Sequence, residues 1–169
     1  MKKGVIQSKV PETNAGKYIA KKNKHILTKI VAVSPELIPK YETPDAACCD
    51  LRANLPDGSV TIGFMETKLI DTGIKIQMPS GYEAQIRCRS GLAKKGIMIT
   101  NGIGTIDEGF RGTLGILLTN TNKNPYIIEH LARIAQMSIK PVLYFNFEQV
   151  DTIDITERNE GGFGSTGEL

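Results

Sequence analysis

Short stretches in which apolar and polar residues alternate, each closed by turn-forming residues, are the feature that most restricts how this chain can fold. Ile74, Ile76 and Met78 alternate with polar residues, and 82–88 repeat the pattern. Alternation with a period of two is typical of strands that bury one face. Three further runs are rich in β-forming residues: Gly115–Asn120, Tyr126–Glu129 and 134–147. The sequence therefore predicts several short strands.

Turn-forming sequences separate these runs at 56–58, 71–73, 79–81 and 122–125. Many short strands at short intervals predict an all-β barrel or a jelly-roll-like sandwich. The one expected helix covers 90–95, with Ser90 as its N-cap and Gly96 ending it. No internal repeat or linker is visible, so we expect one β domain at 26–154. It would lie between an N-terminal arm, 1–25, and a C-terminal arm, 155–169.

The positive charge of the chain is concentrated in its first 25 residues. This segment carries seven lysines and one acidic residue, a net charge of +6, whereas the whole chain has a formal net charge of +3. We expect a mobile, solvated arm, and weak nucleic-acid contact is the alternative. No apolar run approaches the roughly 18 residues of a membrane-spanning helix, so no membrane attachment is expected.

The cysteine and histidine content excludes two classes of small protein. Three cysteines, of which Cys48 and Cys49 are adjacent, are too few for a disulfide scaffold. They favour a reducing, cytosol-like compartment. His25 and His130, without a Cys-x-x-Cys motif, do not make a zinc site.

Glycine is concentrated in two parts of the chain, with seven of the 17 glycines in 91–115 and four in 161–167. Glycine serves where the backbone must approach a ligand closely or adopt a positive φ, and tight turns are the alternative explanation. Arginines beside both clusters favour anion binding.

The first cluster is the segment 89–93, which follows a predicted strand and begins the predicted helix. Free amides at the start of a helix suit phosphate oxygens, and Arg89 can add bidentate contacts. Ile97 stands where a Walker A loop needs lysine, which disfavours a P-loop NTPase. An ordinary strand-to-helix corner is the alternative.

The second cluster, 101–112, lacks the last glycine of a dinucleotide-binding fingerprint. It predicts a hairpin with Asp107 and Phe110 near its tip. An aspartate in a turn is commonly structural, but one beside a phosphate site can act as a general base that holds a water molecule.

The C-terminal arm combines glycines with Arg158, Phe163, Ser165 and Thr166. An isolated phenylalanine among glycines suits stacking on a nucleobase. The arm is expected to act as a lid that orders on a ligand, and a disordered tail is the alternative.

Five segments resemble, in order and spacing, the five motifs of the trimeric dUTP diphosphatases (dUTPases). They are 47–53, 89–93, 101–112, 133–137 and 158–167. The resemblance covers about residues 28–169. It implies a single-domain jelly-roll or β-clip fold and a homotrimer whose active sites are shared between subunits. It also implies hydrolysis of dUTP to dUMP and diphosphate, in the cytoplasm, or in the host cytoplasm or nucleus if the protein is viral.

The resemblance also implies a role for each motif. Asp107 corresponds to the catalytic aspartate, which activates a water molecule for attack on the α-phosphorus. Phosphates would be bound by Arg89, Ser90, Gly91 and Gln136, and by the arm residues Arg158, Gly164, Ser165 and Thr166. Uracil would be recognised by Asn101, Gly102, Ile103, Gly104, Thr105 and Ile106 and stacked on by Phe163, with Phe110 under the deoxyribose. Mg²⁺ would be chelated by the substrate phosphates, with Asp50 in contact only through water.

The chain departs from the family pattern in three places: Cys48-Cys49 replace Gly and an aromatic residue, Phe110 replaces Tyr, and Asn159-Glu160 replace small residues. Two alternatives remain open. A dCTP deaminase has a similar fold and would need a catalytic glutamate where this chain has Asp107, and Glu108 is adjacent to that position. A regulatory trimer would bind dUTP and signal without turnover.

Overall fold

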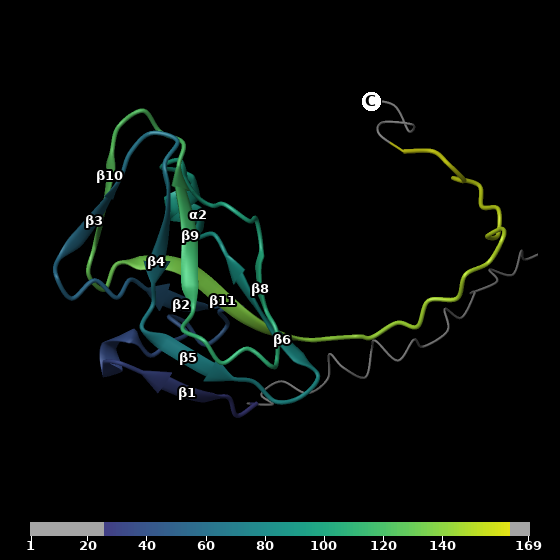
Figure 1. Cartoon of the computed structure of the whole chain (residues 1–169), viewed down its shortest axis with the longest axis horizontal. Coiled ribbons are helices and arrows are strands. Elements are labelled where there is room, and N and C mark those ends of the chain that lie inside the picture. Colours follow the sequence, from purple (N-terminus) through teal and green to yellow (C-terminus); the bar gives the residue numbers. More distant parts are fainter. Residues whose placement is uncertain (1–25, 163–169) are drawn as a thin grey trace, which may run out of the picture.

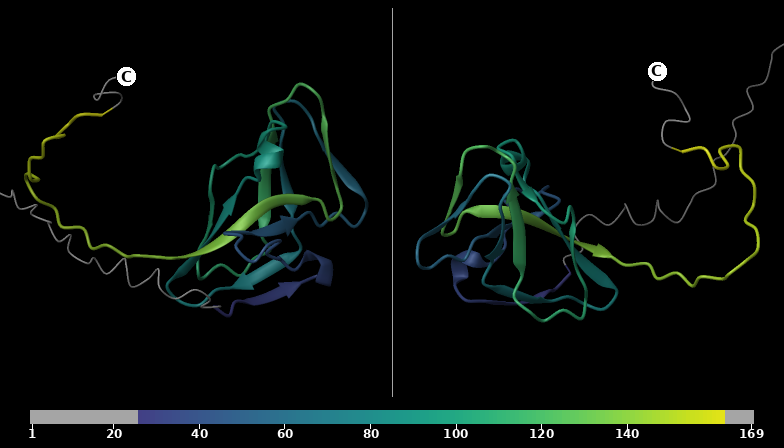
Figure 2. Two further views of the ribbon diagram at one scale, coloured as in Figure 1. Left: turned by 180° about the vertical axis from the view of Figure 1, so that it is seen from behind. Right: turned by 45° about the horizontal axis from the view of Figure 1, so that its top comes forward.

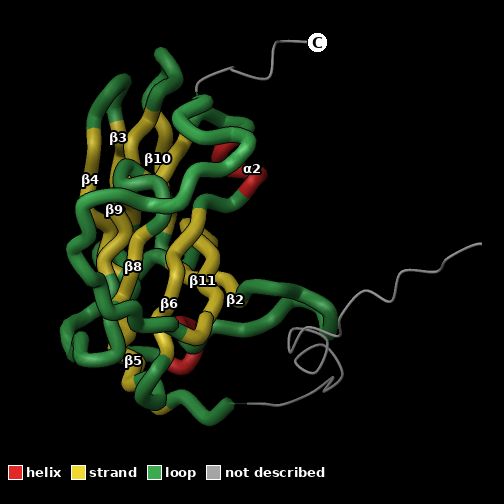
Figure 3. Tube along the Cα trace, turned by 90° about the vertical axis from the view of Figure 1, so that its right-hand side faces the viewer, coloured by secondary structure: helices red, strands yellow, loops and turns green. Residues whose placement is uncertain are grey.

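The computed structural model describes residues 26–162, and antiparallel strands dominate it (Figures 1 and 3). The strands are β1 (Lys29–Ala32), β2 (Cys49–Arg52), β3 (Ser59–Ile62), β4 (Thr67–Asp71), β5 (Ile74–Gln77), β6 (Tyr82–Arg87), β7 (Ile97–Ile99), β8 (Gly104–Ile106), β9 (Gly115–Asn120), β10 (Tyr126–Glu129) and β11 (Arg133–Pro141). One 3-10 turn, η1 (Pro35–Leu37), and one short helix, α2 (Ser90–Ala93), interrupt them. The prediction of an all-β fold with one short helix is confirmed.

The strands form four small sheets in which every pairing is antiparallel. Their orders are β1-β5, β10-β3, β2-β11-β6-β8 and β4-β9-β7. The long strand β11 crosses the body between β2 and β6 (Figures 1 and 2). Within residues 26–162, no helix is long and apolar enough to cross a membrane.

Alternating burial along the strands builds the core. In β5, Ile74 and Ile76 are buried while Lys75 and Gln77 are exposed, as the period-two pattern predicts. In β9 the buried positions are Ile116, Leu118 and Asn120. Burying one such aliphatic side chain stabilises the fold by about 1.5–3 kcal/mol. Strands β9 and β10 have the predicted bounds.

The strand predicted over 134–147 is wrong beyond Pro141. Pairing of β11 with β6 ends at Pro141 opposite Tyr82, where β6 begins, so no partner remains to continue the ladder. The chain then leaves the body without regular structure up to Gly162 (Figures 1 and 2). The apolar side chains of this stretch are exposed: Leu143, Tyr144, Phe145, Phe147, Val150, Ile153 and Ile155.

Two local predictions near the glycine clusters also need correction. Arg89, with extended backbone at φ −82° and ψ 133°, is the N-cap of α2, and Ser90 is its first residue. Gly96 ends the helical segment as predicted, with φ +74°. The segment 101–112 is not a hairpin, because β8 pairs with β6 in one sheet while the next strand, β9, pairs with β4 and β7 in another.

Candidate functional site

A pocket of about 280 Å³ collects residues from three of the five motif segments. We call it the Arg89 pocket. Its lining contains four predicted phosphate-binding residues together with Asp50: Glu42, Ala46, Cys48, Asp50, Arg89, Ser90, Gly91, Arg133 and Gln136. Segments separated by up to 94 positions in the chain therefore meet at one site.

Sheet register explains why these residues meet. Gln136 of β11 lies opposite Asp50 of β2 on one side and opposite Arg87 of β6 on the other. Arg89 follows β6 by two residues, so the β6-to-α2 corner is beside both strands. A pleated sheet places laterally paired residues about 5 Å apart, within reach of each other's side chains.

Asp50 organises the charges of the pocket. Its Oδ1 accepts a 2.9 Å hydrogen bond from Nε of Arg89, and its Oδ2 lies 3.3 Å from Nη1 of Arg133. Nη1 of Arg89 also donates to the carbonyl of Arg133 at 3.2 Å. Only 12% of the Asp50 side chain is exposed, so its charge orients the two guanidinium groups with little screening by solvent.

Hydrogen-bond donors remain available in the same pocket. In the described part of the chain, the amides of Ser90 and Gly91 donate to no acceptor, as expected at the start of a helix. Nε2 of Gln136 donates to the carbonyl of Cys88 at 2.8 Å, which fixes the side chain against the corner. Together with Arg89, these groups suit an anion with several oxygens.

Arg133 and Glu42 line the pocket but were not among the predicted binding residues. A regular strand would place Arg133 and Gln136 on opposite faces, because three positions separate them. A register shift between Arg133 and Ala135 brings both to one side, and the buried pair Ile134 and Ala135 marks the irregularity. The arginine at the start of 133–137 was the only available signal in the sequence.

The predicted catalytic residue lies outside this pocket. Asp107 is exposed, one residue beyond the last pair of β8 with β6, and its carbonyl accepts the amide of Phe110 at 3.1 Å. It is not among the residues that line the Arg89 pocket. One chain therefore does not bring the predicted base and the predicted phosphate-binding residues into one pocket.

Glycines shape the predicted nucleoside-binding segment, 101–106. Gly102 has φ +71°, a conformation that favours glycine. A Cβ on Gly104 would lie 3.3 Å from Cβ of Ile86, so β8 packs closely on β6. The side chains of Asn101, Ile103 and Thr105 are exposed, and that of Ile106 is half-buried.

Phe110 lies directly over Gly112. A Cβ on Gly112 would be 2.6 Å from Cζ of the ring, a distance that side chains do not tolerate. The ring is 42% exposed and so remains available to a ligand.

The predicted residues of the C-terminal arm are placed only in part. Arg158 is exposed, and its Nε donates to the carbonyl of Gly161 at 3.0 Å. It does not line the Arg89 pocket. Phe163, Gly164, Ser165 and Thr166 lie outside the described residues, as does the basic segment 1–25.

The pair Cys48-Cys49 divides between the pocket and the core. Cys49 belongs to β2, is 7% exposed, and its Sγ donates to the carbonyl of Met137 at 3.4 Å. Burial raises the pKa of the Cys49 thiol from 9.0 to about 11. Cys48 is half-buried and lines the Arg89 pocket.

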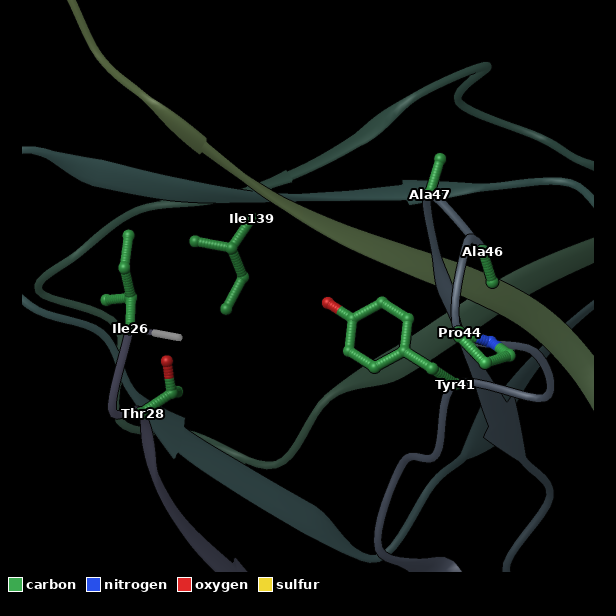
Figure 4. A pocket seen from close by; sticks show the side chains of 7 residues that line it. All are labelled: Ile26, Thr28, Tyr41, Pro44, Ala46, Ala47 and Ile139. Carbon is green, nitrogen blue, oxygen red and sulfur yellow. The ribbon is translucent and has the colours of Figure 1, made fainter. Parts of the chain in front are cut away.

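A second pocket, of about 380 Å³, lies between the start of β1, the segment 41–47 and β11 (Figure 4). Most of its lining residues have aliphatic side chains, and the hydroxyl of Tyr41 points toward Ile139 across it (Figure 4). Burial raises the pKa of Tyr41. No cationic side chain lines this pocket among the described residues, in contrast to the Arg89 pocket.

The carboxylates of the Arg89 pocket suit a metal ion that is already bound to the phosphates of a substrate. In residues 26–162, no group of three or more His, Cys, Asp or Glu side chains could hold an ion. The pocket nevertheless contains the carboxylates of Asp50 and Glu42 beside the residues predicted to bind phosphate. Mg²⁺ commonly binds through one or two carboxylates and substrate phosphates while keeping several waters.

Comparisons with known proteins point to one family. The dUTPase family model matches residues 35–167. A deoxyuridine 5'-triphosphate nucleotidohydrolase of Roseobacter denitrificans is 47% identical over 131 residues, which cover 77% of this chain and 86% of that protein.

Solved structures show the same fold. A Staphylococcus bacteriophage 80alpha dUTPase mutant with dUpNHpp has a TM-score of 0.70 and 25% identity, over 83% of this chain and 98% of that chain. A dUTPase mutant from phage phi11 of S. aureus, described for its coordination of a structural Mg(II) ion, has a TM-score of 0.67. It is 21% identical, over 76% of this chain and 99% of that chain.

Proposed function

This chain belongs to the dUTPase family and is a dUTP diphosphatase. We propose a mechanism in which one part of the site binds the phosphates and another part binds the nucleoside and supplies the general base. The Arg89 pocket binds the phosphate chain, and the segment 101–112 binds the nucleoside and supplies the base. The observation that carries the proposal is the Asp50–Arg89 pair, which lies beside the free amides of Ser90 and Gly91.

The reaction is an in-line displacement at the α-phosphorus. Asp107 orients a water molecule and accepts its proton as the water oxygen bonds to phosphorus. The bond from the α-phosphorus to the oxygen that bridges it to the β-phosphorus breaks, and diphosphate leaves with that electron pair. The products are dUMP and diphosphate, and the proton passes from Asp107 to solvent. The exposed position of Asp107 supports this role, since a water molecule can reach it.

Arg89, Ser90, Gly91 and Gln136 hold the phosphates during this step. Arg89 provides charge-assisted hydrogen bonds that strengthen as negative charge develops on the leaving group. Asp50 holds the guanidinium in position before the ligand arrives, so less ordering is needed on binding.

The segment 101–106 recognises uracil, largely with backbone groups. The positive φ of Gly102 and the close packing of Gly104 on Ile86 leave a backbone surface that a base edge can approach. A tightly fitting surface leaves no room for the methyl group of thymine. Its hydrogen-bond donors and acceptors do not pair with those of cytosine. Phe110 packs under the deoxyribose, where a 2′-hydroxyl would collide with its ring.

A homotrimer with shared sites completes the active centre. Two features of the structure support this assembly: Asp107 is absent from the lining of the Arg89 pocket, and the stretch after β11 exposes a series of large apolar side chains. Because Asp107 does not line the pocket of its own chain, a second subunit would supply it. A neighbouring subunit would also cover the exposed apolar side chains. The C-terminal arm then closes the site with Arg158, Phe163, Gly164, Ser165 and Thr166.

Asp50 would hold, through a bound water molecule, an Mg²⁺ ion that the substrate triphosphate carries. When bound, the ion neutralises charge on the phosphate oxygens. Asp50 also orients Arg89, so the same carboxylate serves the cation and the guanidinium.

The environment of Glu108 disfavours the deaminase alternative. Its carboxylate accepts hydrogen bonds from the amide of Gly81 and, at 3.2 Å, from the hydroxyl of Ser80. A deaminase would need this carboxylate to reach the substrate, whereas both of its oxygens are bonded to the β5–β6 turn.

The deciding experiment incubates the protein with each dNTP and with UTP in the presence of Mg²⁺, and identifies the products. We expect diphosphate and dUMP from dUTP, and little turnover of the other nucleotides. Ammonia release from dCTP would establish the deaminase instead. Tight dUTP binding without diphosphate release would establish the regulatory trimer.

A further inference from the structure

Glu108, the neighbour of Asp107, joins two turns that are far apart in the sequence. Gly81 and Ser80, both in the turn between β5 and β6, donate their amide and hydroxyl hydrogens to its two carboxylate oxygens. The bond from Gly81 is partly buried, and Glu108 itself is half-buried. A charged acceptor makes such bonds about twice as strong as neutral ones.

Asp107 has no comparable anchor of its own. Within the described residues, its carboxylate makes no hydrogen bond or ion pair. The preceding residue, Ile106, is held by its pairing with Ala84 of β6. The backbone at Asp107 is therefore fixed by the sheet on one side and by the Glu108 anchor on the other.

The direction of the side chain follows from the same arrangement. Burial alternates along this segment, with Gly104, Ile106 and Glu108 half-buried and Thr105 and Asp107 exposed. β8 ends at Ile106, and the hydrogen bond from the amide of Phe110 to the carbonyl of Asp107 closes a turn over 107–110. Glu108, the second residue of this turn, is bound to the β5–β6 turn, while the side chain of Asp107 stays exposed to solvent.

Further hydrogen bonds hold both the turn that contains Glu108 and the β5–β6 turn to which Glu108 is bonded. Nη1 of Arg111 donates to the carbonyl of Glu108 at 2.6 Å and to that of Phe110 at 2.8 Å. Gly81, with φ +81°, also accepts the amide of Val142 at 2.9 Å, where the chain leaves β11. Glu108 is thus bonded to a turn that is itself fixed to the end of the longest strand.

We propose that Glu108 is a positioning residue for the reaction: its carboxylate anchors the Asp107 turn to Ser80 and Gly81 and so aims the catalytic carboxylate. This inference rests on the proposed role of Asp107 as the base. It assigns no proton transfer to Glu108. A displacement of about 1 Å in a catalytic group can reduce the rate on the order of 100-fold.

The test compares Glu108→Ala with Glu108→Gln. Alanine removes both bonds, so we expect kcat to fall about 10- to 100-fold while the KM for dUTP changes less than about threefold. Glutamine can accept the amide of Gly81 with Oε1 and donate to the hydroxyl oxygen of Ser80 with Nε2, so it should retain kcat within about threefold of the unmodified protein. Ser80→Ala removes one bond only and should give a smaller loss than Glu108→Ala.

A matched control is Glu83→Ala. Glu83 is a half-buried glutamate of β6, adjacent to the same turn, and its side chain accepts a hydrogen bond from Gln85 rather than from the segment 101–112. Each variant is also checked for Tm and for its elution volume in size-exclusion chromatography, so that loss of folding is separated from loss of positioning. Full activity of folded Glu108→Ala would overturn the proposal. Glu108→Gln as inactive as Glu108→Ala would overturn it too, because the charge and not the hydrogen bonds would then matter.

Different variants test the proposed function and this inference, so the failure of one can be told from the failure of the other. Near-normal diphosphate release by Asp107→Asn contradicts the assignment of the base, whatever the Glu108 variants do. An inactive Asp107→Asn beside a fully active Glu108→Ala contradicts the positioning role alone.

Discussion

Asp50 and Arg89, 39 positions apart in the chain, form the shortest ion pair of the described structure, with 2.9 Å between Oδ1 and Nε. Asp50 lies in β2 and Arg89 follows β6, so the pair spans β11, the strand between them. Gln136 of that middle strand lines the same pocket. The pair therefore connects two motif segments across a third, at the pocket that we propose binds phosphate.

The variant Asp50→Asn tests this pair. It keeps the size of the side chain but removes the charge that orients Arg89, so the KM for dUTP should rise about tenfold, equivalent to the loss of one charge-assisted hydrogen bond. Steady-state kinetics at saturating Mg²⁺ measure the change. The control is Glu42→Gln, since Glu42 lines the same pocket but pairs with Arg133 at 3.6 Å and not with Arg89. An equal effect of both variants would contradict a specific role for Asp50.

Asp107→Asn should separate binding from turnover. The amide keeps the shape of the side chain but cannot accept a proton from water, so kcat should fall about 100- to 10,000-fold. Affinity for a non-hydrolysable dUTP analogue, measured by calorimetry, should change little. Asp57→Asn, at another exposed turn aspartate, should behave like the unmodified protein.

Gly112→Ala should weaken discrimination between deoxyribose and ribose. The new methyl group would lie 2.6 Å from Cζ of Phe110, so the ring must move from its present position. We expect the ratio of kcat/KM for dUTP to that for UTP to fall about tenfold. Gly109→Ala is the matched control in the same segment, because a Cβ there meets nothing within 4 Å. An unchanged ratio in Gly112→Ala would exclude Phe110 from sugar recognition.

Cys49 should make stability depend on pH in the alkaline range. Its pKa is about 11 in the folded chain against 9.0 ordinarily, so the unfolded chain releases the thiol proton first. The stability that the neutral thiol contributes is complete below pH 9 and is lost as pH rises from 9 toward 11. Urea unfolding of the unmodified protein and of Cys49→Ala, both in reductant, should show their difference in unfolding free energy shrinking by about 1 kcal/mol between pH 8 and pH 10. A constant difference would contradict burial of the thiol.

Ending the chain after Ile155 tests the C-terminal arm. The exposed apolar residues from Leu143 to Ile155 are retained, so size-exclusion chromatography should still show a trimer. The arm that we propose closes the site is lost, so kcat/KM for dUTP should fall at least about tenfold. A chain that ends at Gly167 is the control. Full activity of the shorter chain would contradict the lid.

Much of the fold could be read from local patterns. The period-two alternation in β5 and the β-forming runs of β9 and β10 were predicted because one-sided burial and strand propensity are local properties. Gly96 was predicted as a helix end because a positive φ favours glycine. The strand over 134–147 was predicted too long, because its composition does not show where the neighbouring strand begins.

The sequence by itself determined the β class, the family and the chemical types of side chain at the site. Only the tertiary structure decided how those side chains are arranged, because strand register and the shift at Arg133 depend on contacts between distant segments. In the tertiary structure, Arg133 and Gln136 line the same pocket and Asp107 lies outside it. Glu108 is hydrogen-bonded to Ser80 and Gly81. Composition and spacing describe the chain along its length, whereas these relationships arise from the sheet, which pairs residues that the chain keeps far apart.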